Sequence, residues 1–379
     1  ENDLFAFGNN TQSIDQYFLD RANGVPLTLF TPQGNESLSD LYAYLGNAPL
    51  PTGYNYGNYD MQSAYLGYET FIFDEQNPGD LQGTTYVSNI AGNDFYQEYN
   101  QTSTGLNGKL TINTGTQFRD DLYLGLNINS HFINYERTTL FYEENSHPDS
   151  DVNEIYYENT LRTLGTGVSL QLGAIYKLGD MFRIGAAYTS PTWYVISEET
   201  LQYLETDSNE FGPATANPNV INIFPDYQLR TPGKLTGSLA MVFGKSGLLS
   251  FDYSYKDYSN TEFDSEFGNH VFAGQNTSIE NNLKAASTYR VGGEYRIENW
   301  SLRGGYRFEE SPYENEEIMG NLSGYSLGFG YDFGNLELDF AYDFSEREYR
   351  QTLLQTGLEE QAFVDNHNSN YTVTLSFGI

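Results

Sequence analysis

The stretch LSGYSLGFGYDFGNLELDFAYDF, residues Leu322–Phe344, decides the fold. From Tyr325 onward, large apolar side chains occupy every second position on both sides of the pair Gly334-Asn335, and mostly small or polar side chains stand between them. Two alternating runs around a tight turn predict an antiparallel β-hairpin. One face of this hairpin is apolar and aromatic, and the question is what it contacts.

The composition alone would suit a soluble protein. The chain has 379 residues, no cysteine, and 51 acidic against 18 basic residues, for a formal net charge of -33. This excess of acidic charge argues against a nucleic-acid partner, because phosphate binding needs clustered Lys and Arg. No run approaches the roughly 18 apolar residues of a membrane-spanning helix. Transmembrane strands need apolar residues only at alternate positions, so a membrane location stays open.

The alternating pattern recurs along the whole chain. It predicts strands at 105–116, 120–142, 156–178, 182–200, 227–243, 248–263, 284–297, 300–309, 322–333, 335–349 and 370–379, with residues 1–7 as the end of one more. Short connections alternate with long ones, which are 8–104, 143–155, 201–226, 264–283, 310–321 and 350–369. An up-and-down barrel of the outer membrane has this alternation, with short periplasmic turns and long outer loops. A sandwich with Greek-key crossovers has no reason for it.

The residues on the two faces of the predicted strands support the same conclusion. In residues 248–256, Leu249, Phe251, Tyr253 and Tyr255 alternate with polar side chains. A soluble barrel would have to bury dozens of such rings in a small core. Turning the apolar face toward lipid and the polar face toward the lumen avoids this. We therefore predict an all-β fold, a single antiparallel transmembrane β-barrel domain over residues 1–379.

The long segment 8–104 differs from the other loops. Residues Ser13–Gly24 place Ile14, Tyr17 and Phe18 on one helical face, with Ser13 as the N-terminal cap. Residues Met61–Phe73 form a second apolar, aromatic segment. Loops of this length are usually functional. We predict a folded, partly helical extracellular cap; the alternative is a partly disordered acidic loop.

Several stretches resemble a known family, the outer-membrane long-chain fatty acid and hydrophobic-compound transporters of the FadL/OmpP1/TodX type, in the form found in Bacteroidetes. The resemblance rests on residues Gly105–Phe132, Leu170–Tyr194 and Thr231–Ser259, with Ser13–Leu27 in addition. It implies a barrel of about fourteen strands plugged by an N-terminal hatch. The hatch has no match here, so the hatch and first strands are expected to be absent. The first and last strands are then expected not to pair with each other.

The resemblance implies passive uptake of long-chain fatty acids or other hydrophobic molecules across the bacterial outer membrane. The chain would contact outer-membrane lipid and lipopolysaccharide, and it would take a hydrophobic small molecule as its ligand. Two alternatives stay open. One is an interaction barrel within a larger envelope complex, which presents its cap to a protein partner. The other is a general porin for polar solutes.

Strand parity predicts which charged side chains enter the lumen. The bland interpretation is an ion-paired lumen in which charges of both signs fill space. The sharper one is a cationic site for a ligand carboxylate, since the Arg fork matches a carboxylate, with an apolar pocket for its tail under the cap. The predicted ligand-binding residues are Arg290, Arg303, Arg307, Lys234, Tyr17, Phe18, Tyr65 and Phe71.

Two prolines interrupt predicted strands, Pro191 and Pro232. Proline cannot donate a ladder hydrogen bond and occurs in sheets only at edges or bulges. The family resemblance implies a strand kink that opens the barrel wall laterally, and these prolines are candidates for such an interruption. Alternatively, each merely ends the regular ladder near the outer interface.

We predict no enzymatic activity and no cofactor. The histidines, at 131, 147, 270 and 367, have no evident nucleophile partner, and no metal-protease, phosphate-loop or dinucleotide motif is present. The acidic loop Ser146–Glu154 contains Asp149, Asp151 and Glu154, which could bind calcium. Without EF-hand spacing, a solvated negative surface is the preferred interpretation, and no metal site is predicted.

Overall fold

The computed structural model describes residues 2–265, 271–354, 358 and 361–377. Glu1, His270 and residues 378–379 of the last predicted strand lie outside this range. The helices are α1 (Asp15–Ala22), α2 (Leu38–Leu45), α3 (Asn58–Glu69) and α4 (Ala273–Asn282), with 3₁₀ turns at Leu27–Leu29 and Tyr258–Asn260. Among the described residues, no helix has both the length and the apolar character needed to cross a membrane.

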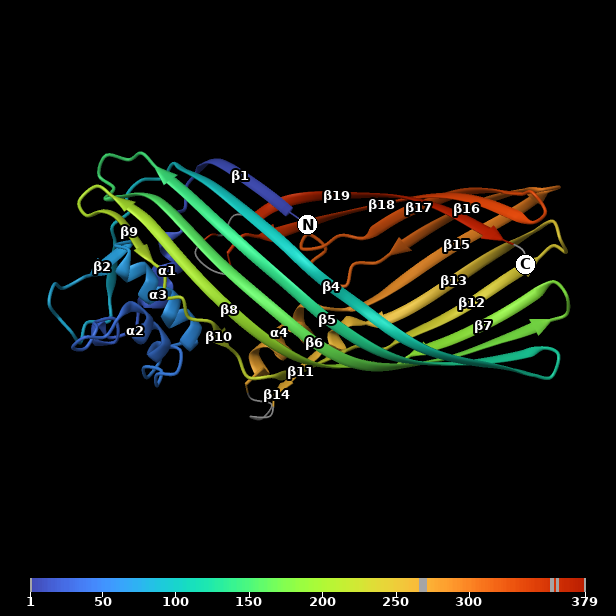
Figure 1. Ribbon diagram of the computed structural model, residues 1–379, viewed down its shortest axis with the longest axis horizontal. Helices are drawn as coiled ribbons and strands as arrows, with labels where there is room; N and C mark the ends of the chain where they lie inside the picture. The colour runs from blue at the N-terminus through green and yellow to red at the C-terminus, as the bar shows by residue number, and fades with distance from the viewer. Residues whose placement is uncertain (1, 266–270, 355–357, 359–360, 378–379) are drawn as a thin grey trace.

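Strands dominate the fold (Figure 1). They are β1 (Asn2–Asn10), β2 (Phe73–Glu75), β3 (Tyr86–Ser88), β4 (Phe95–Phe118), β5 (Leu122–Asn145), β6 (Val152–Leu178), β7 (Phe182–Thr189), β8 (Thr192–Ser208), β9 (Gly212–Ala216), β10 (Asn222–Ile223), β11 (Tyr227–Thr231), β12 (Lys234–Val242), β13 (Gly247–Asp257), β14 (Glu262–Ser265), β15 (Ala285–Ile297), β16 (Trp300–Glu309), β17 (Leu322–Asp332), β18 (Leu336–Thr352) and β19 (Gln361–Phe377).

These strands form an antiparallel meander. β4 pairs with β5 and β5 with β6, β6 continues onto β7 and β8, and β7 pairs with β12. From there β12, β13, β15, β16, β17, β18 and β19 pair in chain order. This confirms the predicted up-and-down barrel. β1 pairs with β4, and within the described residues no register joins β1 to β19, as expected.

Several predicted boundaries were wrong. The predicted strands 182–200, 227–243 and 248–263 are each divided in two, and the last strand begins at Gln361 instead of residue 370. β1 extends to Asn10 and β4 already begins at Phe95, so the cap occupies residues 11–94 and not 8–104. The additional strand residues had been missed because residues 95–104 lack the lipid-type alternation of apolar and small side chains.

The outward face of the barrel wall is apolar and exposed. In the hairpin of β17 and β18, Leu327 is 59 % exposed and Leu338 39 % exposed, with Tyr325 and Phe329 similarly uncovered. The parts of β4, β5 and β6 nearest the short hairpin turns carry a comparable band of exposed Leu and Ile. Large apolar side chains in a continuous exposed band indicate a lipid-facing surface. This confirms the prediction for the stretch Leu322–Phe344.

The strands next to the cap are much longer than a membrane requires. β4 and β5 have 24 residues each and β6 has 27, whereas a tilted transmembrane strand needs about 9–11. Their upper parts therefore extend beyond the lipid band. They run to the end of the molecule where α1, α2 and α3 lie, opposite the short hairpin turns (Figure 1).

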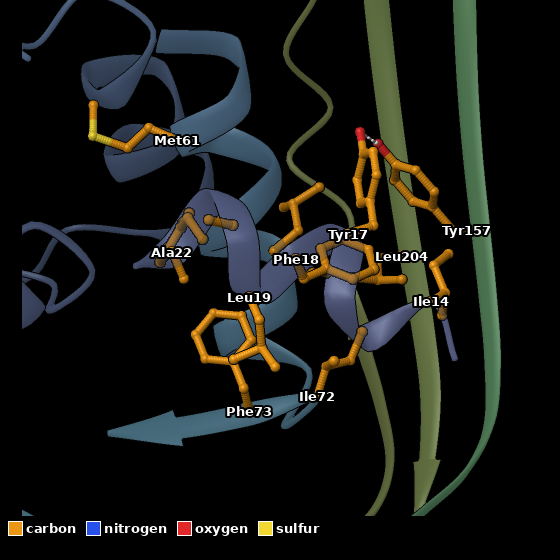
Figure 2. Close-up of a cluster of buried hydrophobic side chains, with 14 of the residues drawn as sticks. Ile14, Tyr17, Phe18, Leu19, Ala22, Met61, Ile72, Phe73, Tyr157 and Leu204 are labelled. Carbon is orange, nitrogen blue, oxygen red and sulfur yellow. Dashed lines mark hydrogen bonds between the residues drawn. The ribbon is translucent and has the colours of Figure 1, made fainter. Parts of the chain in front are cut away.

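The cap packs against these strand extensions through a hydrophobic cluster (Figure 2). Phe18 of α1 is fully buried, and its ring centroid lies 5.1 Å from that of Tyr17 and 5.4 Å from that of Tyr157 on β6. Leu204 of β8 is also fully buried in the cluster. The helix predicted within Ser13–Gly24 is thus confirmed, and it packs against the barrel wall. The residue at the N-cap of α1 is Ile14 rather than Ser13.

The two predicted proline interruptions lie side by side in the wall. Residues 190–191 separate β7 from β8, and residues 232–233 separate β11 from β12. The register places them opposite each other, since Thr231 pairs with Thr192 and Lys234 with Thr189, and a methyl group at Gly233 would lie 3.3 Å from Pro191 Cδ. Ser190 compensates for the broken ladder: its hydroxyl accepts from the Leu170 N–H at 2.9 Å, and its own N–H donates to the Leu170 carbonyl at 2.8 Å.

Candidate functional site

The barrel lumen contains a cavity of about 860 Å³ between β13 and β15–β19. Three of the predicted residues line it, namely Arg290, Arg303 and Arg307. Glycines on the same strands keep the wall thin here: Gly292 and Gly293 of β15 stand opposite Gly305 and Gly304 of β16. The sequence therefore leaves space beside the arginines that larger side chains would fill.

Arg303 of β16 is held by carboxylates from the neighbouring strand β15 and, across β17, from β18. Its Nε donates to Glu294 of β15 at 2.8 Å, and its Nη1 donates to Asp339 of β18 in a closer contact. Glu337 lies 4.0 Å from Nη2. Gly330 of β17 allows this ion pair, because a methyl group there would collide with the Asp339 carboxylate. Arg303 thus fits the bland interpretation of an ion-paired lumen.

Arg290 and Arg307 are placed differently. They face each other directly across β15 and β16 and share one oxygen of Glu309, at 3.7 and 3.6 Å. Arg347 of β18 approaches the other oxygen of Glu309 at 3.5 Å. Like charges directly opposite each other on a sheet are unfavourable, and here three guanidinium groups share one carboxylate. Asp252, opposite Arg290 in the register, and Asp343 also line the cavity.

Sequence reasoning had missed Glu309 and Arg347. Arg347 has the same strand parity as Asp339 and Asp343, which line the cavity, so alternation along this strand could have found it. Glu309 is the last residue of β16, where the alternation ends, and only the register identifies its partners. The group of Arg290, Arg307, Arg347 and Glu309 is called the arginine cluster below.

The cap aromatics do not join this cavity. Tyr17, Phe18 and Tyr65 are at most 5 % exposed in the hydrophobic cluster of the cap, and Phe71 stacks on Phe211 with ring centroids 4.5 Å apart. Among the described residues, none of the cap lines the lumen cavity. Lys234 lies at the start of β12, beside the wall interruption and opposite Lys256 in the register. The predicted ligand-binding residues thus lie in three places: the lumen cavity, the cap and the start of β12.

The acidic loop does not bring its carboxylates together as metal ligands. Asp151 accepts hydrogen bonds from the Ser208 hydroxyl at 2.7 Å and from the Glu210 N–H at 2.9 Å. In the described part of the chain, no group of at least three His, Cys, Asp or Glu side chains could hold a metal ion.

A buried carboxyl joins the cap to the barrel wall. Glu143 of β5 is 1 % exposed and accepts from the Ser13 hydroxyl at 2.5 Å, the Ile14 N–H at 2.9 Å and the Gln97 amide at 2.6 Å. Burial raises the pKa of Glu143 to about 7, although these three donors act in the opposite direction, and the nearby Asp15 raises it further. The first turn of the cap is therefore held by a group that titrates near neutral pH.

We predict that cap stability depends on Glu143 and on pH. Because the folded protein holds this proton more tightly than the unfolded chain, the free energy of unfolding of the cap falls as pH rises from 4.5 to about 7. The loss is on the order of 3 kcal/mol. Hydrogen exchange of the α1 amides at pH 5 and pH 8, corrected for intrinsic rates, should show faster opening at the higher pH. Glu143→Gln should flatten this dependence; an unchanged slope in the variant would contradict the assignment.

Comparison with known proteins gives a family match. A model of the family described as outer membrane protein transport protein (OMPP1/FadL/TodX) matches residues 82–376. No curated protein matches the chain. Similar solved structures include the CymD monoaromatic hydrocarbon channel, with 14% identity over 76% of this chain and 80% of that one and a TM-score of 0.46.

Two further similar structures come from Pseudomonas. A FadL homologue of Pseudomonas aeruginosa has 14% identity, covers 76% of this chain and 75% of that one, and gives a TM-score of 0.49. The toluene transporter TodX of Pseudomonas putida has 14% identity, covers 82% and 74%, and gives a TM-score of 0.42. The family match spans most of the chain, including every strand of the barrel wall from β4 onward. The chain belongs to the OMPP1/FadL/TodX family of outer-membrane transport proteins.

Proposed function

We propose that this barrel is a passive channel for the uptake of long-chain fatty acids or similar amphipathic molecules across the outer membrane. Family membership supports transport of a hydrophobic compound. The observation that carries the choice of an acidic amphiphile is the arginine cluster, in which Arg290 and Arg307 line the lumen cavity and share a single oxygen of Glu309. A ligand carboxylate would relieve the repulsion between these two guanidinium groups.

The two ends of such a ligand are bound by different forces. A carboxylate accepts charge-assisted hydrogen bonds from Arg, which fix its direction. The acyl tail gains about 0.8 kcal/mol for each methylene removed from water, so it needs no specific polar contact. Arg303 is a weaker candidate for direct ligand contact, because Glu294 and Asp339 already hold its guanidinium group.

The wall interruption is the proposed route from the lumen to the membrane. Pro191 and Gly233 lie close together, since a Cβ added at Gly233 would be 3.3 Å from Pro191 Cδ, and no proline nitrogen can donate to a neighbouring strand at this point. On the side away from Gly233, Ser190 keeps its hydrogen bonds to Leu170 of β6. Lys234 follows the interruption directly, and in this proposal its charge guides a carboxylate along it. Outside the barrel the tail would enter outer-membrane lipid or lipopolysaccharide acyl chains.

The cap has a supporting part in this proposal. Because Tyr17, Phe18 and Tyr65 are buried in the cap core, they keep the cap folded, and direct contact between them and a ligand requires the cap to open. Phe71 lies at the edge of this core and is half-buried. A ligand that enters from outside would meet Phe71 before the buried rings.

The test is fatty-acid binding by the full chain in detergent, measured by isothermal calorimetry with a long-chain fatty acid. We expect the double variant Arg290→Gln, Arg307→Gln to weaken binding by about tenfold or more, since two charge-assisted hydrogen bonds are lost. The control Arg119→Gln, Lys245→Gln removes two basic residues from hairpin turns and should change affinity by less than about twofold, because exposed charges at a distance are screened.

Three outcomes separate the candidate functions. Binding that is lost only in the arginine-cluster variant supports the proposal. Equal binding by wild type and both variants would place the acidic head elsewhere. If the wild type bound no long-chain fatty acid or comparable hydrophobic molecule, an interaction barrel in an envelope complex would become the better interpretation.

A further inference from the structure

Four neighbouring strands carry the same short pattern above the lipid band, a tyrosine followed two residues later by a glutamate. The residues between them, Gln97, Glu143, Tyr157 and Leu204, are at most 3 % exposed on the cap side. Alternate strand residues point to opposite faces, so the tyrosines and glutamates face outward. The four copies are Tyr96-Gln97-Glu98 in β4, Tyr142-Glu143-Glu144 in β5, Tyr156-Tyr157-Glu158 in β6 and Tyr203-Leu204-Glu205 in β8.

The strand registers bring these pairs together into one continuous surface. Tyr96 stands opposite Glu144 and Glu98 opposite Tyr142 between β4 and β5. Tyr142 stands opposite Tyr156 between β5 and β6. Tyr156 stands opposite Glu205 and Glu158 opposite Tyr203 between β6 and β8. Rings and carboxylates therefore alternate along each strand and across the β4–β5 and β6–β8 pairs, whereas two tyrosines meet between β5 and β6. We call this surface the tyrosine–glutamate face.

The tyrosine–glutamate face is hollowed rather than convex. Tyr142, Tyr156, Tyr203, Glu158 and Glu205 line a groove of about 700 Å³, which residues after β9 such as Asn217 close on one side. The hydroxyls of Tyr96 and Tyr203 donate to Glu98 and Glu205, both at 2.5 Å. These hydrogen bonds fix the position of the carboxylates next to the rings.

The charge of this surface is one-sided. Glu154 and Asp207 stand opposite each other in the register and extend the acidic area at the groove. Above the lipid band, the described outward positions of β4, β5, β6 and β8 include one basic residue, Arg162. Its guanidinium group already pairs with the Glu199 carboxylate at 3.8 Å. The surface thus repels anions and has unneutralised carboxylates beside aromatic rings.

We propose that the tyrosine–glutamate face is a docking surface for a lysine- or arginine-rich segment of another protein or of a peptide. Guanidinium and ammonium groups bind carboxylates by charge-assisted hydrogen bonds and also interact favourably with tyrosine rings. An extended segment presents every second side chain to one face, which suits a surface whose carboxylates repeat from strand to strand. The site lies outside the lumen, so it does not rest on the proposed uptake function.

Binding of a fluorescein-labelled decaarginine peptide to the full chain in neutral detergent tests the proposal by fluorescence anisotropy. The face variant carries Gln at Glu98, Glu144, Glu158 and Glu205; Gln keeps an acceptor for the two tyrosine hydroxyls. The charge-matched control carries Gln at four exposed acids elsewhere, Glu36, Glu280, Glu314 and Glu348. A third variant, Tyr142→Leu, Tyr156→Leu, Tyr203→Leu, removes the rings without changing the charge.

We expect the face variant to weaken peptide binding by about tenfold or more and the control by less than about twofold. The leucine variant should weaken it several-fold. Equal losses in the face variant and the control would mean attraction by net charge alone and would overturn the proposal. A leucine variant that binds like wild type would do the same, because the surface would then be only a solvated acidic face. Displacement of the peptide by about 1 mM Mg²⁺ from all proteins alike would assign the face to divalent cations instead.

Discussion

Replacing Phe18 with alanine is expected to open the cap to trypsin. Arg21 is the first basic residue of the chain and the next is Lys109, so Arg21 is the single tryptic site within the cap. In the folded protein Arg21 is 2 % exposed, pairs with Asp60 at 2.8 Å and lies 3.7 Å from the centre of the Tyr17 ring. Cleavage after Arg21 therefore requires α1 to leave the cluster.

Truncation of Phe18 is expected to destabilise this cluster strongly. It contacts the rings of Tyr17 and Tyr157, and it fits so closely against α3 that a methyl group at Gly67 would lie 2.9 Å from its Cδ1. Truncation of such a ring costs about 3–5 kcal/mol. When opening is fast relative to cleavage, the cleavage rate follows the population of the open state. The rate should rise by on the order of a hundredfold or more, because about 1.4 kcal/mol is a factor of ten.

The matched control is Tyr44→Ala on the neighbouring helix α2, since Tyr44 is 52 % exposed. It should leave the cleavage rate within about twofold of wild type, because exposed substitutions are usually nearly neutral. Mass spectrometry of the product identifies cleavage after Arg21. A Phe18→Ala variant that is cut as slowly as Tyr44→Ala would show that the cap does not depend on this cluster.

The barrel could be predicted from the sequence because its signal is periodic. From Tyr325 to Phe344 the lipid-facing positions are large and apolar, and alternation alone assigns each of them to the outside. The same rule failed for residues 95–104 of β4. There the outward residues are Tyr96 and Glu98 and the inward ones are Gln97 and Tyr99, which face the cap instead of the lumen. With polar residues on both faces, nothing in the pattern distinguishes a strand from a loop.

The candidate site was predictable only in part: three of its arginines were named, but Glu309, Arg347 and the ion-pair partners were not. Parity placed Arg290, Arg303 and Arg307 in the lumen, and all three line the cavity. Their different environments follow from register: Arg303 is opposite Glu294, whereas Arg290 is opposite Arg307. Register depends on turn lengths and on pairing across strands distant in sequence. Glu143 of β5 likewise accepts hydrogen bonds from Ser13 of the cap and Gln97 of β4. No local sequence pattern predicts these contacts.

A charge placed on the lipid face should prevent efficient assembly of the barrel. Leu327 lies in the middle of β17 on the outward face and is 59 % exposed. Arginine at the bilayer midplane of a barrel wall costs about 2–4 kcal/mol, because its charge has no partner in lipid. We expect Leu327→Arg to reduce the fraction of folded barrel recovered when urea-denatured protein is added to lipid vesicles. Folded and unfolded forms are separated by electrophoresis without heating.

The adjacent residue provides the control. Ser326 lines the lumen cavity and stands opposite Asp343 of β18, so arginine at position 326 enters a polar space and faces a carboxylate. Ser326→Arg should therefore fold as wild type does, although the two variants differ by one position and carry the same added charge. If both variants assembled equally well, Leu327 would not contact lipid. If both failed equally, crowding within β17 rather than membrane exposure would explain the loss. Failure of Leu327→Arg together with normal folding of Ser326→Arg is the result expected of a barrel wall whose alternate residues face lipid and the polar lumen.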